Sequence, residues 1–185
     1  MFESLKKIDE QLLLFENSFH SPFFDILIPH LTDFWVWIPL FIWWGIELHK
    51  IYTRKLIIIF FYIIGLLVAA DRSSVLIKNS VKRYRPTHNI ELKDKIHIVN
   101  DYRGGQYGYV SSHATNAFAV AIFLFLLIKS YPKKWLKTSL FIWALIFCYT
   151  RIYLGVHYPF DLFSGALLGT LLAFVFYKIF VRFST

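Results

Sequence analysis

Three short segments of the chain carry the residue types that handle a phosphate group. The segments are Lys78-x6-Arg85-Pro86, Ser111-Ser112-His113 and Arg151-x5-His157-x3-Asp161. Together they supply three cations, two histidines and one carboxylate. Cleavage of a phosphate ester through a covalent intermediate requires these groups, because the transferred phosphoryl group spreads negative charge over its oxygens while a nucleophile attacks it.

The basic members of the set fit a phosphate clamp. Arg85 and Arg151 each offer a planar fork that can bind two oxygens, whereas Lys78 acts as a point charge. Long basic side chains near helix ends can also simply reach lipid headgroups. We favour that second interpretation for Lys82 and Arg83, because no spacing selects them.

The spacing of His157 and Asp161 predicts a nucleophile with an orienting partner. Residues four apart share one face of a helix, so the carboxylate can hold the imidazole in one tautomer. Pro159 lies between them, and proline is tolerated only in the first turn of a helix.

The second segment predicts a helix start that faces phosphate. Backbone N–H groups at such a start can bind phosphate oxygens, which makes Ser111 and Ser112 candidate phosphate-binding residues. Ser111 can serve as the N-cap at the same time. A protonated His113 could donate to the leaving oxygen as a general acid.

The remaining residues indicate neither a metal nor a cofactor. The other histidines lack ligand spacing, and the carboxylates on this side of the predicted bundle are too few for a two-metal centre. Cys148 is the only cysteine and lies in an apolar segment, so we expect it to be a packing residue.

The composition predicts an all-α membrane protein. Hydrophobic residues make up 57% of the 185 residues, and four segments without charge are apolar all round, which argues against a soluble bundle. These segments are 56–70, 114–128, 138–150 and 162–177. With polar flanks and two weaker segments, they predict six transmembrane helices in one integral-membrane domain, 1–185.

The pattern along the chain predicts where the elements lie. Apolar residues at three- and four-residue spacing make 1–20 an amphipathic helix on the membrane surface. The six spans are expected at about 23–31, 34–48, 53–80, from 111, 134–153 and 158–182. The polar segment 87–110 is then an outer loop near the active site, and Gly165-x3-Gly169 could permit close helix contact.

A net charge of +8 could indicate a nucleic-acid partner, but the cations alternate with the predicted spans. We therefore expect membrane lipids and a lipid phosphate substrate as partners, no nucleic acid and no obligate protein partner. With a cytoplasmic N-terminus, the positive-inside rule puts the phosphate-handling segments on the outer side. The inner cations would be Lys6, Lys7, His49, Lys50, Arg54, Lys55, Lys129, Lys133, Lys134, Lys137, Lys178 and Arg182.

The three segments resemble the signature of the type 2 phosphatidic acid phosphatase (PAP2) superfamily, which also contains vanadium-dependent haloperoxidases. That signature reads Lys-x6-Arg-Pro, then Pro-Ser-Gly-His, then Ser-Arg-x5-His-x3-Asp. The chain keeps its order and approximate spacing from Lys78 to Asp161. It departs from the signature at Val110, Ser112 and Thr150, which replace proline, glycine and serine.

The resemblance implies a role for each residue. His157 would form a phosphohistidine, Asp161 would be its partner, and His113 would protonate the leaving group. The phosphate would be held by Lys78, Arg85, Ser111 and Arg151. It also implies six helices in a bacterial inner (cytoplasmic) membrane, with the active site facing the periplasm. The implied substrates are undecaprenyl diphosphate, phosphatidylglycerophosphate, phosphatidic acid or the phosphates of lipid A.

Several alternatives remain at this point. The enzyme could be a lipid A phosphatase, or a phosphotransferase that passes the phosphoryl group to an alcohol. A non-catalytic anion-binding membrane protein would need cations but not two histidines and an aspartate. Lys93, Lys95 and Arg103 in the loop could meet a second phosphate, although solvated surface charges are the more common explanation.

Overall fold

The structure, a computed structural model, describes residues 2–184, and within this range the regular elements are helical, as the sequence predicts. Each predicted helix occurs, with ends a few residues from those expected. The α-helices are α1 (Phe2–Asn17), α2 (Pro22–Leu31), α3 (Ile38–Tyr52), α4 (Leu56–Val81), α5 (Ser112–Ile128), α6 (Lys134–Tyr153) and α7 (Pro159–Ser184). Two short 3-10 turns, η1 (Phe34–Trp37) and η2 (Pro86–His88), accompany them.

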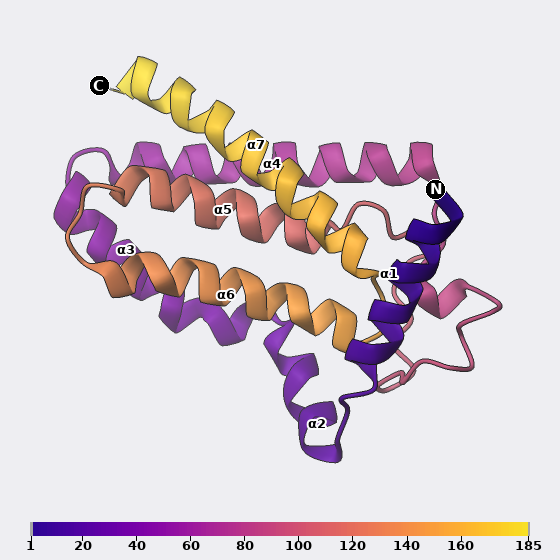
Figure 1. The fold of residues 1–185 in the computed structure, drawn as a ribbon. Coiled ribbons are helices and arrows are strands. Elements are labelled where there is room, and N and C mark those ends of the chain that lie inside the picture. The colour runs from indigo at the N-terminus through magenta and orange to yellow at the C-terminus, as the bar shows by residue number, and fades with distance from the viewer. Residues whose placement is uncertain (1, 185) are drawn as a thin grey trace.

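Helix α5 lies at the centre of the bundle and packs against α4, α6 and α7. Four of its residues are alanines with almost no exposed surface, Ala114, Ala117, Ala119 and Ala121. Small side chains let neighbouring helices approach closely, which suits packing in an apolar environment where burial alone provides little driving force. Figure 1 shows α4, α5 and α6 running alongside one another, with α1 at one end of the bundle.

Helices α5 and α7 approach each other closely at Gly165 and Gly169, the glycine pair noted in the sequence. A Cβ at Gly165 would lie 2.6 Å from the carbonyl oxygen of Ser111, and one at Gly169 would lie 2.9 Å from the amide nitrogen of Ala119. Both neighbours are backbone atoms, which cannot move aside as a flexible side chain can. The pair therefore sets the distance between the two helices that carry His113 and Asp161.

Replacing Gly169 with alanine is expected to destabilise the bundle by about 2 kcal/mol or more, because overpacking against backbone forces helices apart. The measurement is thermal unfolding in detergent. Gly45→Ala is the matched control, since a Cβ there would meet nothing within 4 Å. An equal melting temperature for both variants would contradict this account of the α5–α7 contact.

The predicted six transmembrane helices are not confirmed. Among residues 2–184, only α4 and α7 are long and apolar enough to cross a membrane by themselves. A third span is possible if α2 and the following segment Phe34–Tyr52 act as one, although they are bent by 78° relative to each other. Helix α2 has 10 residues and is about 15 Å long, about half the thickness of a bilayer core.

Helix α1 is amphipathic as predicted, but its polar side faces the protein. Its apolar stripe is 41–60% exposed and comprises Leu5, Ile8, Leu12, Phe15 and the following Phe19. The buried stripe is Asp9, Leu13 and Asn17, four residues apart. Asn17 donates to the carbonyl oxygen of Tyr153 at 2.8 Å and accepts from the amide of His97 at 2.7 Å.

This docking corrects one sequence prediction. Lys6 and Lys7 were expected with the inner cations, on the side away from the phosphate-handling segments. They belong to α1, which contacts α6 and α7 and bonds through Asp9 to the first turn of α7. The two lysines therefore lie at the same end as His157, because sequence charge alone does not reveal where a surface helix docks.

Candidate active site

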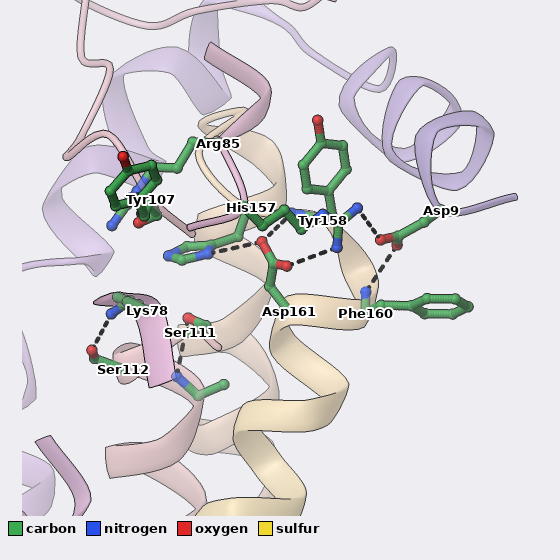
Figure 2. A network of polar contacts seen from close by, with 12 residues as sticks. Asp9, Lys78, Arg85, Tyr107, Ser111, Ser112, His157, Tyr158, Phe160 and Asp161 are labelled. Atoms are coloured by element: carbon green, nitrogen blue, oxygen red, sulfur yellow. Dashed lines mark hydrogen bonds and ion pairs between the residues drawn. The ribbon is translucent and has the colours of Figure 1, made fainter. Parts of the chain in front are cut away.

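The three predicted segments meet at the end of the bundle where α1 docks. Lys78 comes from the last turn of α4, His113 from the first turn of α5, and Arg151 from the end of α6. His157 lies in the turn between α6 and α7, and Asp161 lies in the first turn of α7. Figure 2 shows part of this cluster from close by, with His157 next to Asp161 and Lys78 next to Ser112.

His157 and Asp161 form the predicted pair, although His157 lies just before the helix. Its Nδ1 is 3.3 Å from Asp161 Oδ2, and the same oxygen accepts the Tyr158 amide at 3.1 Å. Pro159 is the first residue of α7, where its missing N–H leaves no hydrogen bond unmade. The carboxylate thus fixes both the imidazole and the start of the helix.

The second ring nitrogen of His157 is left available for chemistry. The side chain is fully buried, and its Nε2 has no hydrogen-bond partner in the described part of the chain. Burial lowers the pKa of His157 well below its usual range, and the positive charges of Arg85 and Arg151 lower it further. At neutral pH the imidazole is therefore uncharged, with its proton on Nδ1 toward Asp161 and a lone pair on Nε2.

Arg151 and His113 lie in direct contact. Arg151 Nη1 is 2.8 Å from His113 Nε2, and since arginine only donates, that nitrogen must be the acceptor. Arg151 is almost fully buried, and its Nε and Nη2 have no hydrogen-bond partner among residues 2–184. Two aligned donors without a protein acceptor match the two oxygens that an arginine fork binds.

The start of α5 has the predicted N-cap. Ser111 Oγ accepts the Ala114 amide at 3.5 Å, and the Ser111 amide donates to the carbonyl oxygen of Asp161 at 3.0 Å. The Ser112 hydroxyl accepts from Lys78 Nζ and lies 2.6 Å from the hydroxyl of Ser74. The helix start is therefore tied both to α7 and to the lysine of the first segment.

Arg85 is held by the segment 87–110. Its backbone pairs with Gln106, and its Nε donates to the carbonyl oxygen of Tyr107 at 3.2 Å. A Cβ at Gly108 would lie 2.8 Å from Asp161 Oδ2 and 3.2 Å from Arg85 Cγ, so this position needs glycine. The Tyr102 ring lies against Arg151, with its centroid 5.6 Å from the guanidinium carbon.

Arg83 corrects another sequence interpretation. It was expected to reach lipid headgroups, but its Nη1 donates to Asp161 Oδ1 at 2.9 Å and its Nη2 to Asp9 Oδ2 at 2.7 Å. Its guanidinium carbon also lies 3.8 Å from the centroid of the Tyr158 ring. The sequence did hold one signal, since Asp9 lies off the apolar stripe of its helix, on a neighbouring face that can contact the protein.

The family model of the PAP2 superfamily matches residues 54–184. This range covers well over half of the chain and includes every predicted site residue. The chain belongs to the PAP2 superfamily. Helix α1, which carries Asp9, and helix α2 lie outside the matched range.

Two curated PAP2 relatives align over nearly the whole chain. A lipid A 4'-phosphatase of Bacteroides thetaiotaomicron is 38% identical over 182 residues, which cover 97% of this chain and 80% of the relative. A lipid A 4'-phosphatase of Porphyromonas gingivalis is 28% identical over 97% of this chain and 75% of its own length.

Two crystal structures share the PAP2 fold of this chain. LpxE of Aquifex aeolicus has a TM-score of 0.68 at 24% identity, over 91% of this chain and 93% of its own. The first transmembrane PAP2-type phosphatidylglycerolphosphate phosphatase from Bacillus subtilis has a TM-score of 0.72 at 18% identity, over 97% and 88%. At these identities the likeness concerns the fold, and the chain is a membrane protein of that fold.

The three departures from the PAP2 signature fit into the site without displacing its ionisable groups. The Ser112 hydroxyl meets Lys78, while Val110 is buried beside the helix start. Thr150 bonds back to the carbonyl oxygen of Phe147 at 2.7 Å, within its own helix. The cations, both histidines and Asp161 are therefore brought together as the signature requires.

Proposed function

We propose that the protein is a metal-independent lipid phosphatase that works through a phosphohistidine intermediate. The observation that carries the proposal is the buried Nε2 of His157, which has no hydrogen-bond partner among the described residues. The Nε and Nη2 atoms of Arg151 also have no partner there. A nucleophile with an available lone pair, close to arginine donors without acceptors, suits a phosphate that is attacked while its charge is held. Asp161 orients the nucleophile, and Lys78, Arg85 and the helix start at Ser111 and Ser112 complete the phosphate site.

In the first step, Nε2 of His157 attacks phosphorus and the bond from phosphorus to the leaving oxygen breaks. The Nδ1 proton stays shared with Asp161, which stabilises the positive charge that develops on the imidazole. Binding of the phosphate draws Arg151 away from His113 Nε2. That nitrogen can then take the proton of a phosphate monoanion, which titrates near neutral pH, and pass it to the leaving alcohol.

In the second step, water replaces the alcohol. His113 Nε2 takes a proton from the water as its oxygen attacks phosphorus, and the bond from phosphorus to Nε2 of His157 breaks. Inorganic phosphate leaves, His113 gives its proton to the departing phosphate, and both His113 and His157 return to their neutral forms. The positive charges of Lys78, Arg85 and Arg151 stabilise the equatorial oxygens in both steps without moving between them.

The preferred substrate class is a lipid that carries a phosphate monoester, with lipid A 4'-phosphate as the first candidate. Two relatives bear that activity in their names and align with 97% of this chain. The fold neighbour from Bacillus subtilis makes phosphatidylglycerophosphate the second candidate. Phosphatidic acid is a third monoester candidate. Undecaprenyl diphosphate, whose terminal phosphate is held by an anhydride bond, is the alternative outside this class.

The membrane placement that follows differs from the predicted six spans. We propose that α3 to α7 form the membrane part of a single integral-membrane domain, with α1 and α2 on the surface at the catalytic end. The opposite end gathers the cations around the α3–α4 and α5–α6 connections, where Lys133 and Lys50 pair with the buried Glu47. The positive-inside rule then places the active site on the outer, periplasmic side of the inner membrane.

Purified protein in detergent with EDTA is expected to release inorganic phosphate from at least one lipid of this set. Orthovanadate, which mimics the transferred phosphoryl group, is expected to inhibit the reaction. The measurement is phosphate release across lipid A, phosphatidylglycerophosphate, undecaprenyl diphosphate and phosphatidic acid. Binding of these lipids without release from any of them would favour an anion-binding protein, and transfer to an added alcohol in place of release would favour a phosphotransferase.

A further inference from the structure

Helix α1 contributes a carboxylate to the active-site charge network. Asp9 is fully buried, although it belongs to a surface helix. Its Oδ2 accepts from Arg83 at 2.7 Å, and its Oδ1 accepts the Phe160 amide at 2.9 Å. Figure 2 shows Asp9 extending toward Phe160 and the start of α7, one residue from Asp161.

Arg83 lies between two carboxylates and joins them into one chain. One end of its guanidinium pairs with Asp161, at 2.9 Å, and the other with Asp9. Asp161 in turn faces Nδ1 of His157. The order is Asp9, Arg83, Asp161 and His157. The first two links are ion pairs, and the third joins the Asp161 carboxylate to the neutral imidazole; of these groups only Arg83 is partly exposed.

Because Arg83 donates to both Asp9 and Asp161, its hydrogen bonds are shared between two carboxylates. If Asp161 were its sole partner, the guanidinium could turn both of its donors to that carboxylate, since arginine prefers a two-oxygen pairing with an acid. Asp161 would then be drawn away from the imidazole that it orients. The Phe160 amide bond also fixes the first turn of α7, which carries Asp161.

Asp9 also balances charge close to the nucleophile. Four cations surround His157, namely Lys78, Arg83, Arg85 and Arg151, and their positive charges act on it together. Among the described residues, two carboxylates contact this cluster. Asp9 and Asp161 both pair with Arg83, and Asp161 also lies beside His157. Loss of the Asp9 charge would make the net charge of the groups around the imidazole more positive by one.

We propose that Asp9 and Arg83 are positioning residues, which hold Asp161 in place to orient His157 and thereby make the docked surface helix α1 part of the catalytic apparatus. The inference rests on the proposed phosphatase function. It extends the functional residues beyond the three PAP2 segments, to a helix outside the range that the family model matches.

The test compares Asp9→Asn with Asp9→Glu and Asn17→Ala, using p-nitrophenyl phosphate as substrate and orthovanadate as inhibitor. Asp9→Asn is expected to lower kcat about tenfold with KM and vanadate inhibition unchanged or tighter, because orientation is lost while positive charge is gained. Asp9→Glu should restore most of kcat. Asn17→Ala is the matched control, since it removes another buried polar anchor of α1 without touching the charge network, and its kcat should stay within about twofold.

A kcat for Asp9→Asn within twofold of the wild type would overturn the inference. So would an equal loss in Asn17→Ala, since the effect would then come from docking of α1 in general. Failure of the proposed function looks different, because His157→Ala would then match the wild type. An inactive His157→Ala beside a fully active Asp9→Asn would reject the positioning role alone.

Discussion

Replacing His157 with alanine is expected to reduce kcat for lipid phosphate hydrolysis by about 10⁴-fold or more. The buried imidazole is the group whose available nitrogen faces the phosphate site while its other nitrogen is held by Asp161. Alanine removes the covalent route and leaves the cations that bind phosphate. The fold should persist, because the substitution removes a polar side chain and leaves the glycine contacts between α5 and α7 in place.

Orthovanadate binding separates loss of chemistry from loss of structure in this variant. Binding should weaken much less than turnover falls, since Arg151, Arg85 and Lys78 remain. His49→Ala is the matched control, because His49 is exposed at the opposite end of the bundle and should leave turnover unchanged. Turnover by His157→Ala within tenfold of the wild type would rule out a histidine nucleophile at this position.

Replacing His113 with glutamine is expected to lower kcat/KM more for a substrate with a poor leaving group than for one with a good leaving group. For an alkyl or sugar phosphate, kcat/KM should fall by about 10³-fold, because the alkoxide needs a proton as it leaves. For p-nitrophenyl phosphate the loss should be about tenfold or less, since the phenolate leaves without one. Glutamine keeps an acceptor for Arg151, which His113 Nε2 provides in the structure.

The comparison of the two substrates is the informative measurement here. kcat/KM reports the steps up to phosphoryl transfer to the enzyme, so the role of His113 in the later attack by water does not enter it. Equal losses on both substrates would assign His113 to phosphate binding or to the support of Arg151, and would contradict its role as the general acid.

Much of the site was predictable from the sequence because its chemistry is local. His157 and Asp161 are four residues apart, and the serines before His113 cap the helix that it begins. The spacing of the three segments singled out Lys78, Arg85 and Arg151, whose positive charges suit a phosphate group. The helices themselves followed from the length and apolar character of each segment.

Arg83 and Asp9 were missed because their pairing joins parts of the chain 74 residues apart. A sequence shows which face of α1 is apolar, but it does not show whether that face meets lipid or protein. For α1 the apolar face is exposed and the polar one docks, so Asp9 is buried and Lys6 and Lys7 lie at the catalytic end. The predicted number of spans also depended on three-dimensional information. From its sequence, α2 was expected to be a separate transmembrane helix, but in the structure it is short and bent by 78° relative to the following segment.

The most direct test of the account is to trap the covalent intermediate. Enzyme mixed with a ³²P-labelled lipid phosphate and quenched within milliseconds should carry label that is stable to alkali and released by acid, as expected for a phosphohistidine. The label should map to the peptide that contains His157, should be absent from His157→Ala and should precede the release of inorganic phosphate. Phosphate released without any labelled enzyme, or label on a different residue, would contradict the proposed mechanism.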